Sequence, residues 1–265
     1  MMLKLTEKEE IARKKVCLPL DGLDTFDQFK ERVEGLSPVV GLFKVGKESY
    51  TRFGPKAVEL VQMHGSNVFL DLKYHDIPQT VKRSADAATQ LGVYMFNVHA
   101  AGGIEMMEAA VEGSKEAAEK YGVIVPKILG VTILTSIDKE IMNKELRIEG
   151  SVESQVRWLA YNAGLAGLDG VVCSTAELDY IKAHLSKDFI YATPGIKGLN
   201  DAVGSDQKRV FTPGNAIRDG SSILVIGRAI TDPRTKEQKN NNVSVNLEMQ
   251  LNAGYEILRD MAKYL

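Results

Sequence analysis

The sequence has little cysteine and no long apolar run, and both shortages exclude classes of protein. Its 265 residues include two cysteines, Cys17 and Cys173, far apart and outside any CxxC, so we expect neither a disulfide framework nor a cysteine-ligated metal. No stretch approaches the roughly 18 apolar residues of a membrane span, and the N-terminal segment is too charged to contain the apolar core of a signal peptide. We therefore expect a cytoplasmic protein that does not enter a membrane.

Basic charge is not in excess either. Lys and Arg number 33 against 35 Asp and Glu, a net charge of −2, and no run of five basic residues occurs. This balance argues against a nucleic-acid partner, because such surfaces carry clustered positive charge. Small anionic ligands remain compatible with it, since a few local cations are enough to bind them.

Short apolar runs rich in β-branched residues recur, with segments of helical spacing between them, a pattern typical of βαβ units. About 250 residues is the usual size of a (β/α)8 TIM barrel. We therefore predict an α/β protein with this fold in a single domain, residues 1–265. A doubly wound open sheet is the alternative, but no GxGxxG follows the first strand and such sheets have about six strands. The eight predicted strands are Val16–Leu20, Leu42–Val45, Val68–Leu72, Met95–His99, Lys127–Val131, Gly170–Cys173, Phe189–Thr193 and Ile223–Ile226.

Helical spacing of apolar residues is clear in three segments. One follows Pro78, which suits the first turn of a helix because its missing N–H would be unpaired there. The others cover 152–163 and 251–261. The stretches 138–150 and 232–242 are expected to be the least structured of the chain, and the second to be a solvated loop without chemistry.

Charged residues stand at the ends of two neighbouring predicted strands. In a parallel barrel, side chains at i and i+2 near the C-terminal end of a strand both point into the mouth, where active sites lie. Asp71 and Lys73 have this spacing, Asp76 follows just past the strand, and Lys44 ends the preceding strand. A charged loop is the simpler interpretation. However, unpaired charges in buried strands cost several kcal/mol, so this pattern favours a catalytic site.

Polar residues also end the first and fourth predicted strands, namely Asp21 and His99. For His99 alone we expect a structural role with a hydrogen bond. The other histidines share no metal-ligand spacing, and we predict no metal site.

A second group of residues matches the place where barrels bind phosphate, the loops after strands seven and eight. Strand seven continues into TPGIKG with Lys197, and strand eight into Gly227 and Arg228. Glycine lets backbone N–H groups approach a phosphate, and a guanidinium binds it through two hydrogen bonds. The intervening loop, with Gln207, is expected to close over the ligand.

Taken together, these motifs resemble the orotidine 5′-phosphate decarboxylases over nearly the whole chain. The resemblance implies a (β/α)8 homodimer that converts orotidine 5′-monophosphate to UMP and carbon dioxide, the last step of de novo pyrimidine synthesis, with no metal or organic cofactor. The motifs are LPLD ending at Asp21, FKVG at Lys44, DLKYHDIPQT from Asp71 to Thr80, NVHAAGG at His99, VTILTS around Thr135, TPGIK at 193–197, DQKR at Gln207 and IGRAIT at Arg228.

The resemblance also implies a role for each matching residue. Lys73 would be the proton donor within a charged tetrad, to which Asp76 would be contributed across the dimer interface. The tetrad would be Lys44, Asp71, Lys73 and Asp76; the ribose would be bound by Asp21 and by Thr80 of the partner chain, the pyrimidine by Thr135, and the phosphate by Lys197, Gln207, Gly227 and Arg228, with Gln207 bridging to the base.

The chain departs from the family pattern at three places. Lys197 stands where many relatives carry Arg and keeps the charge without the bidentate fork. Gln79 stands where Asn is usual, and 232–242 looks like an insertion before the last helix.

Two rival functions differ from this one in their requirements. A sugar-phosphate decarboxylase or aldolase of the same superfamily needs Mg²⁺ and an acidic ligand beside Asp71, where the second strand instead offers Lys44. A silent barrel that only binds a nucleotide has no reason to keep Asp71, Lys73 and Asp76.

Overall fold

The computed structural model describes residues 4–197 and 212–265 and contains a closed barrel. Its strands are neighbours in chain order from β1 to β8, and their pairings are parallel. The predicted (β/α)8 fold and all eight predicted strands are confirmed, with ends that shift by at most two residues. The strands are β1 Val16–Pro19, β2 Leu42–Gly46, β3 Asn67–Tyr74, β4 Met95–His99, β5 Lys127–Val131, β6 Gly170–Val172, β7 Ile190–Pro194 and β8 Ile223–Val225.

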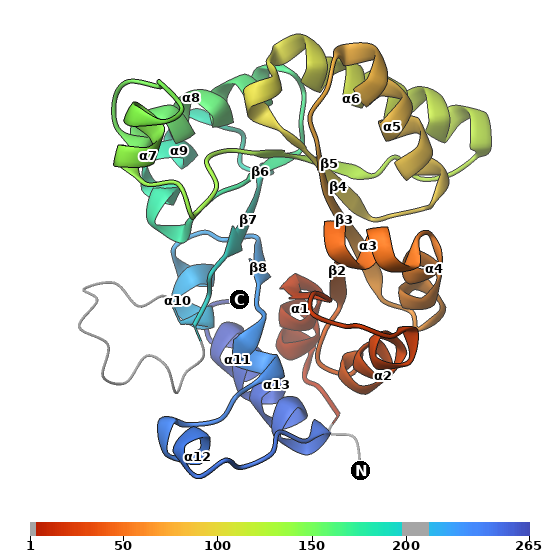
Figure 1. The fold of residues 1–265 in the computed structure, drawn as a ribbon, viewed down its shortest axis with the longest axis vertical. Helices are drawn as coiled ribbons and strands as arrows, with labels where there is room; N and C mark the ends of the chain where they lie inside the picture. Colours follow the sequence, from red (N-terminus) through yellow and green to blue (C-terminus); the bar gives the residue numbers. More distant parts are fainter. Residues whose placement is uncertain (1–3, 198–211) are drawn as a thin grey trace. The chain divides into compact units, whose positions relative to one another are not determined.

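Helices follow or precede the strands along the chain (Figure 1). In the part of the chain that the structure describes, three short 3₁₀ turns lie among them. The α-helices are α1 Glu7–Lys15, α2 Phe26–Leu36, α3 Lys47–Phe53, α4 Lys56–Met63, α5 Pro78–Gln90, α6 Ile104–Tyr121, α7 Lys139–Lys144, α8 Val152–Leu165, α9 Leu178–Ile181, α10 Pro213–Arg218, α11 Arg228–Thr231, α12 Lys236–Asn240 and α13 Leu247–Ala262. The 3₁₀ turns are η1 Ala100–Gly102, η2 Thr175–Glu177 and η3 Lys182–His184.

The expectation of little structure at 138–150 and of a loop at 232–242 was wrong in part, because each stretch contains a short helix. Asp138 begins α7 by accepting a hydrogen bond from the Ile141 N–H at 2.9 Å. Thr235 and Gln238 form a reciprocal capping box at the start of α12. Such caps satisfy the free N–H groups of a first turn, which is how a polar segment without apolar periodicity becomes helical.

The described chain forms two compact units. The central unit is Phe69–Ala192, and the terminal unit combines 1–68 with 193–265. That residues 1–265 are one domain stays a prediction.

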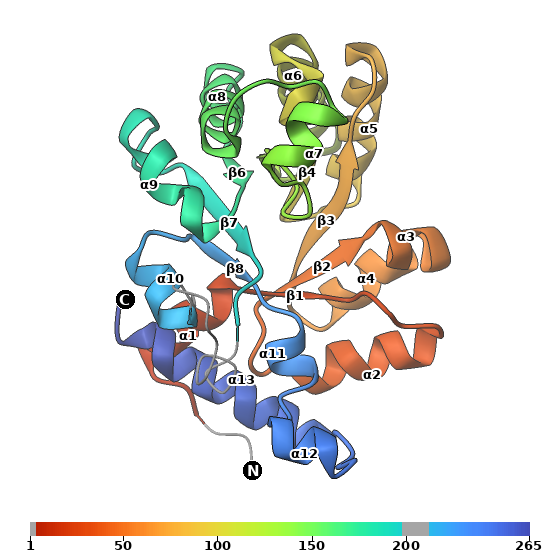
Figure 2. The same cartoon turned by 60° about the vertical axis from the view of Figure 1, so that its left-hand side comes forward.

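In the terminal unit, β1 pairs with both β2 and β8, so the first and last strands of the chain are hydrogen-bonded neighbours. Pro19 lies opposite Lys44 in this register. Helix α13 runs beside α1 and α10 (Figure 2). Its apolar residues Tyr255, Leu258 and Met261 are buried, as the spacing predicted.

In the central unit, β3 to β7 are neighbours and α5 and α6 lie side by side (Figure 1). Helix α5 begins at Pro78, as predicted, and buries Val81, Ala85 and Ala88. Gly92, at φ +65°, ends it by donating to the Thr89 carbonyl, a conformation that costs glycine little. The start of α5 therefore directly follows the charged end of β3.

Within residues 4–197 and 212–265, no helix has both the length and the apolar character needed to cross a bilayer.

Glu177 gives the fold a stability that depends on pH. Its carboxylate accepts a hydrogen bond from the Ser174 N–H at 2.8 Å just after β6, and burial raises its pKa above the ordinary 4.5. The folded chain then holds the proton more tightly than the unfolded chain. Between the unfolded and folded pKa values, the free energy of unfolding therefore falls as the pH rises, by about 1.4 kcal/mol for each pKa unit of difference.

We expect Glu177→Gln to remove this pH-dependent contribution to stability, while its side-chain oxygen still accepts the hydrogen bond from the Ser174 N–H. Relative to the unsubstituted protein, its free energy of unfolding should increase from about pH 4 to about pH 7. Urea denaturation at a series of pH values measures the difference, with the exposed Glu149→Gln as control. Parallel pH curves for the Glu177 variant and the unsubstituted protein would contradict the assignment.

Candidate active site

The C-terminal end of β3 carries an ion pair that is largely withdrawn from solvent. Lys73 Nζ lies 2.6 Å from Asp71 Oδ1, and their side chains are 25% and 9% exposed. At this distance the contact is a charge-assisted hydrogen bond. The predicted convergence of these two residues at the strand end is thus found within the central unit.

The two side chains meet where the pairing of β3 with β4 is interrupted, as in a β-bulge. The register of β3 against β4 shifts between Leu70 and Tyr74, and Lys73 has a φ of +50°. This left-handed conformation is uncommon for a residue with a Cβ and costs on the order of 1 kcal/mol or more.

Asn97 on β4 contacts both members of the pair, and the sequence analysis missed it. Its Oδ1 accepts from the Lys73 backbone N–H at 2.8 Å, and its Nδ2 donates to Asp71 Oδ1 at 2.7 Å. The available signal was an amide in an otherwise apolar strand, MFNVH, which predicts a buried polar contact.

The other predicted residues of the central unit lie on exposed segments. Asp76 follows the end of β3, and its Oδ1 accepts from the Ile77 N–H at 2.7 Å. Thr80 is in the first turn of α5 and is exposed. Thr135 is exposed in a turn after β5, closed by the Ile137 N–H and the Leu134 carbonyl at 2.8 Å.

The terminal unit holds a second pair of predicted residues. Lys44 Nζ lies 3.1 Å from Asp21 Oδ2, with side chains that are 12% and 47% exposed. The hydrogen bond from the Leu20 N–H to the Lys44 carbonyl aligns the two strand ends that carry them. Asp21 lies just beyond the end of β1 and Lys44 lies within β2, and their side chains meet there.

Gly46, at the end of β2, leaves the space that this pair occupies. A Cβ at this position would lie 2.8 Å from Asp21 Oδ1 and 2.9 Å from Lys44 Nζ. Both distances are too short for a carbon in contact with these atoms. Glycine therefore lets the Lys44–Asp21 pair lie directly against this position.

We expect Gly46→Ala to fold and to displace the pair, because both colliding atoms are mobile side-chain ends. A crystal structure of the variant should show the Lys44–Asp21 distance beyond about 4 Å. The temperature of thermal unfolding should change little, because the two side-chain ends can move away from the added methyl group. Gly164→Ala in α8 is the control; its added methyl meets the Leu185 side chain at 3.0 Å. An unmoved ion pair in Gly46→Ala would refute the crowding argument.

The predicted phosphate residues lie after β7 and β8. Gly227 precedes α11 and accepts from the Ile230 N–H at 2.9 Å, and Arg228 begins that helix with an exposed side chain. Within the described ranges, Arg228 has no ion-pair partner. Lys197 is half-buried, and Gln207 lies outside the described residues.

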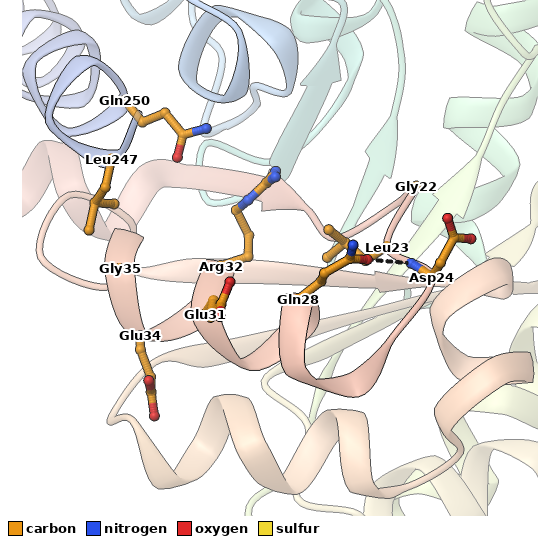
Figure 3. A pocket seen from close by; sticks show the side chains of 10 residues that line it. All are labelled: Gly22, Leu23, Asp24, Gln28, Glu31, Arg32, Glu34, Gly35, Leu247 and Gln250. Atoms are coloured by element: carbon orange, nitrogen blue, oxygen red, sulfur yellow. Dashed lines mark hydrogen bonds between the residues drawn. The ribbon is translucent and has the colours of Figure 1, made fainter. Parts of the chain in front are cut away.

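A separate groove of about 720 Å³ lies in the terminal unit beside α2 and the start of α13 (Figure 3). The side chains of Arg32 and Gln250 point toward one another there. None of the predicted residues that the structure describes lines this groove.

Comparison with known proteins places these residues in one family. The model of the orotidine 5′-phosphate decarboxylase / HUMPS family matches residues 14–241, which include every predicted site residue. The chain belongs to this family.

Proteins named orotidine 5′-phosphate decarboxylase are similar to the chain in both sequence and structure. The one from Syntrophus aciditrophicus (strain SB) is 47% identical over 226 residues, covering 85% of this chain and 89% of the relative. The one from Moorella thermoacetica is 46% identical over 220 residues, covering 83% and 86%. A crystal structure of the enzyme from Lactobacillus acidophilus has a TM-score of 0.76 at 33% identity and covers 93% of this chain and 98% of that chain.

Membership of the orotidine 5′-phosphate decarboxylase family confirms the resemblance carried by the sequence motifs. The matched residues run through all eight strands and end before α13. The match ends within the 232–242 stretch, at residue 241.

Proposed function

We propose that the chain decarboxylates orotidine 5′-monophosphate to UMP and carbon dioxide. The observation that carries this proposal is the Lys73–Asp71 ion pair at the end of β3, in a barrel whose relatives bear the name of this enzyme. An ammonium beside a carboxylate at a strand end is what this reaction requires, for the following chemical reason.

Lys73 would stabilise the charge that develops and then protonate it. Loss of carbon dioxide from C6 leaves an electron pair in the ring plane, where the π-system does not delocalise it. An ammonium about 4 Å away is worth about 4 kcal/mol at an effective dielectric of about 20, and it is in place before the charge appears. The same ammonium would be the acid that protonates C6, and the N–H bond that breaks would supply the C6–H of UMP.

Asp71 would act on both sides of this step. Its carboxylate would hold the Lys73 ammonium in place through the 2.6 Å ion pair. It would also lie next to the leaving carboxylate and repel it, a repulsion that disappears when neutral carbon dioxide forms.

The remaining predicted residues would bind the rest of the substrate. Binding energy from the phosphate, which is remote from C6, serves to position the base. We propose Asp21 for the ribose, Lys44 and Asp76 for the charged tetrad, Thr80 for the ribose in the partner's site, Thr135 for the pyrimidine, and Lys197, Gln207, Gly227 and Arg228 for the phosphate. We further propose that the protein is a cytoplasmic homodimer in which the chemistry uses no metal or organic cofactor.

The ultraviolet absorbance of orotidine 5′-monophosphate tests the function directly, because decarboxylation removes the orotate chromophore. We expect the purified protein to remove it at the same rate with and without EDTA. A rate abolished by EDTA would point to the magnesium-dependent sugar-phosphate rival. An unchanged spectrum in both arms would leave the silent, nucleotide-binding barrel.

A mixing experiment tests the shared site. If Asp76 acts in the partner's site, a heterodimer of Lys73→Ala and Asp76→Ala chains contains one intact site and one doubly defective site. Random re-association should therefore recover about a quarter of the unsubstituted activity, since half of the dimers are mixed and one of their two sites works. No recovery in a mixture shown to exchange subunits would place Asp76 in its own chain's site.

A further inference from the structure

We propose that Asn97 is a positioning residue for the reaction, whose side-chain amide holds Lys73 and Asp71 in their reactive arrangement. This inference rests on the proposed function. Asn97 lies on β4, the strand beside β3, and its side chain is buried.

The oxygen and the nitrogen of the Asn97 amide make different hydrogen bonds. Oδ1 accepts the hydrogen bond from the Lys73 backbone N–H at 2.8 Å, and Nδ2 donates to Asp71 Oδ1 at 2.7 Å. A backbone N–H is only a donor, so the oxygen of Asn97 must face it, and the NH₂ group must then face Asp71. The amide orientation therefore follows from the contacts.

The contact with Lys73 holds an unfavourable backbone. Lys73 has a φ of +50° within the bulge that interrupts the β3–β4 register. A conformation of this kind persists only where its surroundings stabilise it. The Lys73 backbone N–H donates to the Asn97 side chain at this point. This hydrogen bond fixes the position of the backbone from which the Lys73 side chain extends.

The contact with Asp71 fixes the carboxylate. Asp71 Oδ1 accepts both from Asn97 Nδ2 at 2.7 Å and from Lys73 Nζ at 2.6 Å. Two donors on one oxygen restrict rotation of the carboxylate, and the ammonium is drawn to a defined point. The reaction rate depends strongly on the placement of the reacting groups, since a shift of about 1 Å lowers the rate about 100-fold.

Asn97 is a buried amide among apolar residues of β4 and β5. It is 1% exposed between Phe96 and Val98, both fully buried, and Leu129 is its register partner on β5. An amide in such a place costs several kcal/mol unless both ends are hydrogen-bonded. Here both ends are used on the proposed catalytic pair.

Removal of the amide is the first test. We expect Asn97→Ala to lower kcat for orotidine 5′-monophosphate about 100-fold while KM changes less than about threefold, because the phosphate contacts are untouched. Calorimetric titration with UMP should give an unchanged affinity. Thr89→Val in α5 is the matched control: it also removes a buried hydrogen bond, from Thr89 Oγ1 to the Ala85 carbonyl at 2.8 Å, and should leave kcat unchanged.

The isosteric variant Asn97→Asp gives a pH dependence of kcat that a purely structural role would not produce. In Asn97→Asp the introduced carboxyl keeps the acceptor for the Lys73 N–H. When ionised it repels Asp71, and when protonated its O–H donates to Asp71 as the amide did. Among the described residues, the titratable groups beside position 97 are Asp71 and Lys73 from β3 and His99 two residues further along β4. Its register partner on β5, Leu129, is apolar. The ratio of variant to unsubstituted kcat should therefore rise about tenfold as the pH is lowered from about 8 to about 5.

The outcomes separate the two proposals. If the unsubstituted protein fails to decarboxylate the substrate, the proposed function falls. If that protein is active but Asn97→Ala retains its kcat, or the Asn97→Asp ratio is flat with pH, the positioning role is refuted. If Asn97→Ala does not fold, the isosteric Asn97→Asp decides the question alone through its pH profile.

Discussion

Replacement of Lys73 by Ala is expected to lower kcat by at least about 1,000-fold. The lost ammonium accounts for about 4 kcal/mol of charge stabilisation, which corresponds to about that factor, and the lost acid removes proton delivery as well. The decrease in absorbance of orotidine 5′-monophosphate measures kcat, and titration with UMP measures whether the nucleotide still binds. We expect UMP affinity to fall far less than kcat, because the phosphate contacts do not involve Lys73.

Lys127→Ala is the matched control for this variant. Lys127 is also a strand lysine in an ion pair, with Asp169 at 2.8 Å, but it begins β5 whereas Lys73 is near the end of β3. It should keep full activity. Turnover retained by Lys73→Ala would remove Lys73 from the mechanism, whatever the control shows.

Replacement of Arg228 by Ala has the second large effect, and it should fall on binding. Hydrogen bonds to a charged phosphate are worth about 1.5 to 3 kcal/mol, so we expect KM to rise about 10- to 100-fold with a smaller change in kcat. The exposed Arg228 side chain at the end of β8 has no ion pair in the described ranges and is available to such a ligand. Initial rates over a range of substrate concentrations give both constants.

A comparison of UMP with uridine assigns the effect to the phosphate. Arg228→Ala should weaken UMP and leave uridine, which has no phosphate, unchanged. Arg259→Ala, which removes an exposed guanidinium near Glu9 at 3.7 Å, should alter neither. An unchanged KM in Arg228→Ala, or equal losses for UMP and uridine, would overturn the phosphate assignment.

Local signals in the sequence were sufficient for most of the fold. The apolar runs that became β1 to β8 are short and rich in β-branched residues, and Pro78 and the spacing from Val81 to Ala88 mark α5. Helices α7 and α12 were missed because they are short, polar and begin at caps, where no apolar periodicity exists to detect.

The charged residues at the end of β3 were also predicted from the sequence, although the backbone geometry that carries them was not. Alternation along a strand placed Asp71 and Lys73 on one face, and the two do meet at 2.6 Å. The contact lies, however, where the β3–β4 register shifts and Lys73 is left-handed, neither of which alternation predicts. A bulge depends on the register with a neighbouring strand, and a single strand's sequence carries no record of that register.

The sequence by itself determined the eight strands, the charged residues at their ends and the family to which the chain belongs, because periodicity, caps and motifs are properties of nearby residues. Only the tertiary structure decided that Asn97 holds the Lys73–Asp71 pair and that Gly46 leaves room for Lys44 and Asp21. The Asn97 contacts join residues that are 24 and 26 positions apart. They exist only once the strands have paired, since pairing sets which side chains face each other and how closely.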